Sequence, residues 1–153
     1  MANLAQQHLS ERSLFEHDAR YFYLLTPNVI YAKELTLKMV LDMHKDIMFP
    51  ANPLIAGDLR ATEIDVRDHS GVSAEEVPAK MAEFVAWFNS HEHTTNLISL
   101  TAEVHYRLTF IHPFAGGNGR CARLSSNFVL ALKGFNTVIF DENMRKEYNN
   151  SLM

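Results

Sequence analysis

The chain has 153 residues, carries 14 lysines and arginines against 18 aspartates and glutamates, and is 47% hydrophobic, with a formal charge of −4. These values fit one globular domain with a buried core, and they exclude a disordered or collagen-like chain. The negative charge argues against nucleic-acid binding. A single cysteine excludes an internal disulfide, and no stretch reaches the roughly 18 apolar residues of a membrane span, so we expect a cytoplasmic protein without a membrane partner.

Apolar residues at helical spacing predict the main elements in chain order. After a polar N-terminal extension (about 1–30), the first amphipathic helix runs over 31–48. A second helix follows a capping box with Ser73 as N-cap and Glu76 at N3, and it ends near Asn89.

Two further core helices are predicted over about 96–110 and 121–132, and a last helix would begin near 141. Between the first two helices, residues 56–70 show partial alternation of apolar and polar side chains, which predicts a short hairpin or flap. We therefore expect one all-α domain over 1–153 with a small β-hairpin flap.

A glycine-rich loop lies between the two later core helices. Gly116, Gly117 and Gly119, interrupted by Asn118, let the backbone N–H groups form a concave nest, and the next helix N-terminus adds unpaired donors. Arg120 and Arg123 lie on one side of that helix, and two guanidinium groups over an anion nest suit a polyphosphate. The alternative is a plain helix–helix turn with solvated arginines.

His112 comes at the end of the preceding helix, directly before this loop. An imidazole there could accept a hydroxyl proton close to bound phosphates, a role that typically contributes about 10²–10⁴ in rate. Phe114 is expected to point inward and anchor the loop.

The segment HPFAGGNGRCAR resembles the signature HxFx[D/E]GNGRxxR of the Fic-domain family (filamentation induced by cAMP). Seven of its eight defined positions match, namely His112, Phe114, Gly117, Asn118, Gly119, Arg120 and Arg123. The resemblance covers most of the chain from Leu35 on, so it predicts a Fic core over 35–153 that lacks a C-terminal helix in one interpretation.

The resemblance implies a protein adenylyltransferase (AMPylator), which moves AMP from ATP to a serine, threonine or tyrosine hydroxyl of a target protein. His112 would be the catalytic base. The phosphates would be held by Gly117, Asn118, Gly119, Arg120 and Arg123. The target would be positioned by a strand-like flap formed by Thr62, Glu63, Ile64, Asp65 and Val66.

Gly116 is where the sequence departs from the pattern, because the family has an acid there that holds Mg²⁺. The resemblance therefore implies Mg²⁺ held mainly by the ATP phosphates, with no ligand from protein side chains. Activity could be reduced, and the alternative is a degenerate Fic domain that binds nucleotide or a partner without turnover. Kinase-like and phosphocholine-transferring relatives leave the donor and the transferred group open.

Three further features complete the sequence-based hypotheses. The family's inhibitory motif [ST]xxxE[GN] is absent, so regulation would come from a separate chain or a homo-oligomer, and self-modification is a further expectation. Cys121 beside Arg120 could be a nucleophile, although buried packing is favoured. His91 and His93 lack a third ligand and are interpreted as loop residues.

Overall fold

A computed structural model describes residues 32, 34–64, 72–138 and the single positions 144, 147 and 150. Four α-helices lie within these ranges: α2 (Leu37–Met48), α3 (Val77–His91), α4 (Leu97–Ile111) and α5 (Asn118–Leu132). The predicted N-terminal extension, the start of the last predicted helix, and Asp65 and Val66 of the flap lie outside the described residues.

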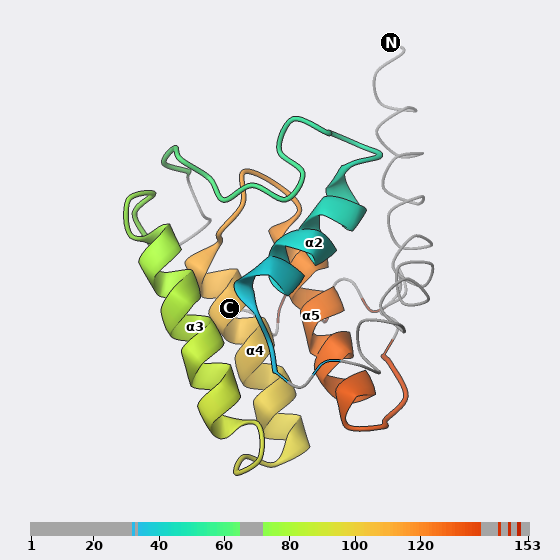
Figure 1. The fold of residues 1–153 in the computed structure, drawn as a ribbon. Coiled ribbons are helices and arrows are strands. Elements are labelled where there is room, and N and C mark those ends of the chain that lie inside the picture. Colours follow the sequence, from blue (N-terminus) through green and yellow to red (C-terminus); the bar gives the residue numbers. More distant parts are fainter. Residues whose placement is uncertain are drawn as a thin grey trace.

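The four helices form one bundle in which α4 packs against both α3 and α5, and α2 packs across α5 and α3. Figure 1 shows α3 and α4 side by side, with α2 crossing in front of α5. The end of α2, the start of α3, the end of α4 and the start of α5 all lie at the same end of the bundle. The connections at that end therefore bring distant segments of the sequence together.

The all-α prediction is confirmed, and the helix bounds follow from their caps. The Thr36 side chain accepts a hydrogen bond from the Met39 N–H (3.2 Å), so α2 begins at Leu37 rather than at the predicted residue 31. The Asn96 side chain accepts from the Ser99 N–H (3.0 Å) and starts α4 in the same way.

The prediction that α3 starts with Ser73 as its N-cap is wrong. Residues 74–76 form a turn, and the helix begins at Val77 with Glu76 as the N-cap residue. The Ser73 hydroxyl donates to the Glu76 carboxylate (2.7 Å), and hydrogen bonds from the side chain and the backbone of Ser73 lower the pKa of that carboxylate, so the two residues do meet as their spacing predicts. Pro78 lies in the first turn of the helix, where a missing N–H costs nothing.

The hairpin prediction receives no support from the part of the flap that is described. Residues 58–64 and 72–73 follow an irregular path without strand pairing, and the intervening residues lie outside the described ranges. The hairpin therefore stays a prediction.

The core is built from apolar side chains of all four helices, as their periodicity predicts. The largest fully buried ones include Met81, Phe84 and Phe88 of α3, Leu100 and Leu108 of α4, Phe128 of α5, and Phe114 of the loop. Burying each such side chain contributes roughly 1.5–3 kcal/mol to the stability of the fold, so the helix ends that carry the loops are held in place by the packed core. Of the helices in the described ranges, none is long and apolar enough to cross a membrane.

Candidate active site

His112 ends α4 in the left-handed conformation, with φ 50° and ψ 59°. It is the one non-glycine residue with positive φ in the described part of the chain. A left-handed non-glycine residue costs roughly 1–2 kcal/mol and persists only where its surroundings hold it, which is common at functional sites.

Two contacts fix this residue on either side of its Cα atom. The ring Nδ1 lies 3.3 Å from the Thr109 carbonyl oxygen, which can only accept, so Nδ1 carries a proton in that contact. A neutral ring with this tautomer has its lone pair on Nε2. The His112 carbonyl accepts a hydrogen bond from Nε of Arg60 (2.8 Å).

The loop after His112 is closed by Asn118. The Phe114 N–H donates to Oδ1 of Asn118 (2.9 Å), and Nδ2 of Asn118 donates to the Phe114 carbonyl (2.8 Å). Phe114 is fully buried, as predicted. The side chain of Asn118 thus shapes the loop.

Gly117 is required by both backbone conformation and space. Its φ of 75° is left-handed, and a Cβ atom there would lie 2.6 Å from Sδ of Met48. The first backbone N–H to bond within α5 is that of Cys121, which donates to the Gly117 carbonyl (3.0 Å). The first N–H groups of a helix generally have no acceptor inside it, and together with the positive end of the helix dipole they make this terminus suited to an anion.

Gly116 directs its carbonyl into the protein. Nε2 of His44 donates to it (2.9 Å), while Nδ1 of His44 accepts from the Gly57 N–H (3.0 Å). The His44 ring also stacks on Phe114 with centroids 3.6 Å apart. Burial lowers the pKa of His44, which favours the neutral ring that this pair of hydrogen bonds needs.

The two arginines of α5 bring positive charge to its N-terminal end. Nη2 of Arg120 lies 3.1 Å from Sδ of Met48. Nη1 of Arg123 would lie 3.5 Å from a Cβ on Gly119, so this guanidinium folds back toward the first turn. Burial, and secondly the charge of Arg123, lower the pKa of His105 to about 4. The His105 ring therefore adds no positive charge beside Arg123 at neutral pH.

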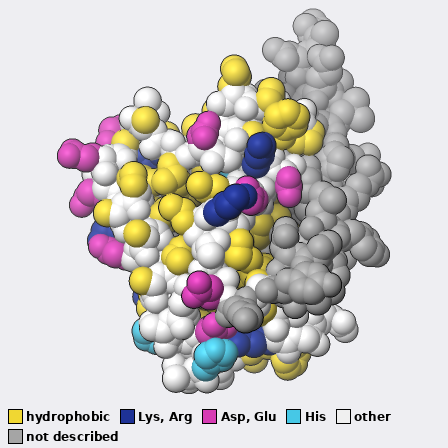
Figure 2. Space-filling view, viewed as in Figure 1, with side chains coloured by type: hydrophobic (Ala, Val, Ile, Leu, Met, Phe, Trp, Pro, Cys, Tyr) yellow, Lys and Arg dark blue, Asp and Glu magenta, His cyan; other side chains and the backbone are white. Residues whose placement is uncertain are grey.

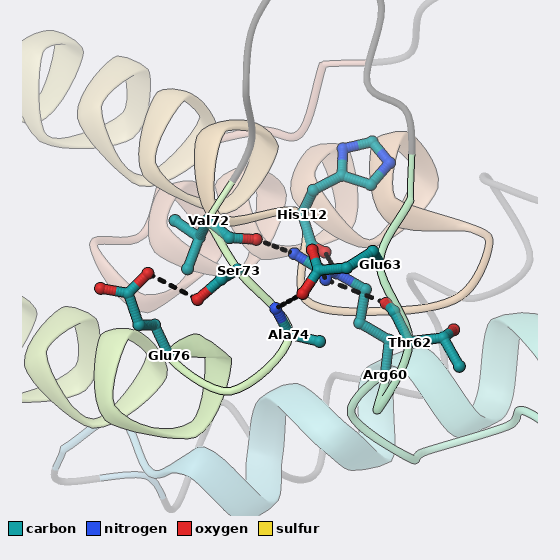
Figure 3. A network of polar contacts seen from close by, with 8 residues as sticks. All are labelled: Arg60, Thr62, Glu63, Val72, Ser73, Ala74, Glu76 and His112. Atoms are coloured by element: carbon teal, nitrogen blue, oxygen red, sulfur yellow. Dashed lines mark hydrogen bonds and ion pairs between the residues drawn. The ribbon is translucent and has the colours of Figure 1, made fainter.

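The described part of the predicted flap is anchored at its base. The Thr62 carbonyl accepts from Nη1 of Arg60 (3.1 Å), and a Glu63 carboxylate oxygen accepts from the Ala74 N–H (2.8 Å). Figure 3 shows these groups converging beside His112, whose ring projects away from the guanidinium. Ile64 is half-buried.

The described part of the site offers few side chains that could bind a metal ion. Within the described ranges no three histidine, cysteine, aspartate or glutamate side chains converge as a metal site would need. Gly116 has no side chain, and its carbonyl is bound to His44. The residues present therefore do not fit a protein-held Mg²⁺ at this position.

Cys121 is fully buried, and burial raises its thiol pKa to about 12. A thiolate nucleophile is therefore excluded, and the predicted packing role is confirmed.

His91 bonds through Nδ1 to the Trp87 carbonyl (2.9 Å), and its ring lies 5.5 Å from that of Trp87.

A search against family descriptions matches residues 34–130 to the Fic/DOC family. The match covers more than half of the chain. The chain belongs to the Fic/DOC family.

Two curated relatives are named protein adenylyltransferases. This Fic-family chain is 37% identical over 120 residues to protein adenylyltransferase fic-1 of Caenorhabditis elegans. The matched region covers 78% of this chain and 24% of the relative. The chain is 32% identical over 144 residues to protein adenylyltransferase Fic of Nematostella vectensis, in a match that covers 90% of this chain and 34% of the relative. The chain thus spans a quarter to a third of the length of these relatives.

Solved structures share the fold. A Fic-1 fragment from Caenorhabditis elegans superposes with a TM-score of 0.69 at 35% identity, covering 80% of this chain and 37% of that one. A Fic domain containing signaling protein from Bacteroides thetaiotaomicron gives 0.70 at 30% identity, covering 78% and 47%.

Two residues at this Fic site were not found from the sequence. They are His44 of α2 and Arg60 of the segment that follows α2. His44 shares the buried face of α2 with Val40 and Ile47, which was the available signal. Arg60 has no comparable signal, because its partners are backbone carbonyls.

Proposed function

We propose that this chain transfers AMP from ATP to a hydroxyl side chain of a protein, with His112 as the general base. The observation that carries the proposal is the position of His112, held left-handed at the end of α4, six residues before the basic N-terminal turn of α5. The names of the curated relatives support the same reaction.

In the proposed step the target hydroxyl oxygen attacks the α-phosphorus, and its proton passes to Nε2 of His112. The bond from the α-phosphorus to the bridging oxygen breaks, and pyrophosphate leaves. The α5 N-terminal amides at Gly117, Asn118 and Gly119 would hold the phosphates, and the guanidinium groups of Arg120 and Arg123 would offset their charge. Such electrostatic positioning is the main contribution a protein makes to phosphoryl chemistry.

Mg²⁺ would enter this site as part of the substrate, bound to the ATP phosphates. No step of the proposal needs a protein ligand at Gly116. The target segment would lie against the flap at Thr62–Val66. Protein targets and the chain itself are the proposed acceptors, in the cytoplasm, and a separate inhibitory chain or a homo-oligomer is the proposed regulator.

A second candidate is a nucleotide-binding module without turnover. It is favoured by Gly116, which lacks the acid and turns its carbonyl onto His44. The two candidates predict different outcomes for the same experiment.

The experiment incubates the protein with Mg²⁺ and ATP labelled at either the α- or the γ-phosphate, alone and with cell extract. Label from the α-phosphate only, lost by about 10²–10⁴ in His112→Asn, supports AMP transfer. Asparagine is chosen because it tolerates the left-handed backbone, whereas alanine would add strain.

Gly116→Glu and Gly116→Gln form the matched pair for the acid position. A Cβ on Gly116 would meet only Cδ1 of Ile55 at 3.4 Å, and its φ is not positive, so the backbone accepts a side chain at this position in both variants. More α-label in Gly116→Glu but not in Gly116→Gln identifies a competent site that lacks its acid. No label in the wild type or Gly116→Glu, with ATP still bound, overturns the transferase and leaves the binding module, while γ-label indicates a kinase-like reaction.

A further inference from the structure

Arg60 is a buried arginine whose side chain is 1% exposed. Its guanidinium donates to three backbone carbonyls: Nε to His112 (2.8 Å), Nη1 to Thr62 (3.1 Å) and Nη2 to Val72. Its own N–H donates to the Pro113 carbonyl (2.8 Å). Figure 3 shows the guanidinium between the segments that carry these carbonyls.

The contact with His112 falls on the peptide that determines where the ring points. Because His112 is left-handed, its carbonyl turns away from the α4 axis and cannot follow the helical hydrogen-bond pattern. The guanidinium donates to this carbonyl, and the Arg60 N–H donates to the next carbonyl, that of Pro113. Both peptides after the α4 terminus are thus held by one residue.

The other two carbonyls hold the guanidinium itself. Thr62 lies two residues after Arg60 and Val72 twelve residues after it, so the donor plane is fixed from two directions. The Glu63 carboxylate lies 4.0 Å from Nη1 but is largely exposed, and it balances the charge only partly. An arginine suits this arrangement because its donors lie in one rigid plane, whereas a lysine ammonium is a single point charge.

We propose that Arg60 is a positioning residue, which fixes the left-handed peptide of His112 and thereby the direction of the imidazole in the active site. The inference rests on the proposed function for its effect on catalysis. Arg60 acts through His112 and does not belong to the α5 end that would hold the phosphates. Loss of Arg60 therefore impairs the rate of transfer and leaves nucleotide binding intact.

The test compares wild type, Arg60→Lys and Arg60→Met by two readouts. The first is self-labelling from α-labelled ATP with its kcat and its KM for ATP. The second is the nitrogen NMR signals of the histidine rings, which need no activity. Val104→Ala, a buried variant eight residues before His112 on α4, is the control for general loss of stability, compared at equal fractions of folded protein.

We expect Arg60→Lys to lower kcat by about tenfold or more, because small misplacements of a catalytic group have effects of this size, while KM for ATP stays within about twofold. The His112 ring signals shift, and the His44 signals, whose partners are Gly116 and Gly57, stay in place. If Arg60→Met does not fold, Arg60→Lys carries the test alone.

Unchanged kcat and unchanged His112 signals in Arg60→Lys overturn the proposal, as does an equal fall of kcat in Val104→Ala. A rise in KM for ATP with unchanged kcat also overturns it. If wild type transfers no label, the proposed function fails on its own, and the His112 signals still decide whether Arg60 positions the ring.

Discussion

The two segments beside His112 are held in different ways. The loop 113–118 is fixed by several separate residues: Asn118 closes it from within, His44 binds the Gly116 carbonyl from α2, Met48 packs against Gly117, and the Arg60 N–H binds the Pro113 carbonyl. On the other side, the segment that begins at Arg60 depends mainly on one guanidinium. Contacts that are spread over several residues make the loop tolerant of single losses, whereas one shared donor makes the other segment sensitive to one substitution.

Arg60→Met is the variant that tests this contrast most strongly. It removes the guanidinium donor of one buried contact, to Val72, and of two half-buried contacts, to His112 and Thr62. Since an unsatisfied buried group costs about 1–3 kcal/mol, we expect a loss of about 3 kcal/mol in the free energy of unfolding. Urea denaturation measures it. Arg107→Met is the control, because Arg107 is 37% exposed and is held by Glu103 (2.8 Å) and by Trp87 (4.1 Å to the ring centroid).

The control should lose about 1 kcal/mol or less. Equal losses of unfolding free energy in the two arginine variants would show that Arg60 stabilises the fold no more than an exposed arginine does. The contrast between the two segments would then be wrong.

Gly117→Ala tests the loop at its tightest point. The added Cβ would lie 2.6 Å from Sδ of Met48 at a φ of 75°, so we expect a loss of about 2–4 kcal/mol from strain and overpacking together. Gly134→Ala has nearly the same φ, 78°, with nothing within 4 Å, and should lose only about 1 kcal/mol. The difference between the two variants in urea isolates the clash with Met48, and a difference near zero would contradict it.

Asn118→Ala tests the contact that closes the loop from within. It removes two hydrogen bonds to buried Phe114, so we expect a loss of about 2 kcal/mol in the free energy of unfolding. Asn127 makes the same pair of bonds to Val138 (both 2.9 Å) at an exposed site. Because water can replace those bonds, Asn127→Ala should lose about half as much, and a larger loss than in Asn118→Ala would be unexpected.

The sequence predicts the helices and the glycine-rich nest of this site but not the residues that hold it, Arg60 and His44, for a physical reason. The helices follow from apolar spacing, and the nest follows from glycines before a helix start, since both signals are local. Arg60 and His44 bind backbone carbonyls of His112 and Gly116, at separations of 52 and 72 residues. Every residue offers a carbonyl, so no side-chain pattern in the sequence marks these partners.

The capping-box error has a different origin. Ser73 and Glu76 meet as their spacing predicts, yet residues 74–76 form a turn and the helix begins only at Val77. A spacing rule identifies which groups can meet, but it does not determine at which residue the helical hydrogen-bond pattern begins.

The smallest expected effect is a pH dependence from buried His44 and half-buried His105. His44 and His105 have lowered pKa values, and that of His105 is about 4 against an ordinary 6.5. As pH falls below 6.5 the unfolded chain takes up protons that the folded chain does not, so stability decreases. Between about pH 7.5 and pH 6 we expect the share of His105 to be under about 1 kcal/mol, and His44 acts in the same direction.

Urea unfolding at several pH values in this window measures the slope. His105→Gln should make it shallower, and His93→Gln, at a side chain 78% exposed, controls for the number of histidines. His44→Gln should also flatten the slope, but it additionally removes the hydrogen bond to Gly116, so its loss persists at pH 7.5. A wild-type stability that rises as pH falls through this window would contradict the neutral state of both rings, and with it the view that His44 holds the loop as a neutral donor.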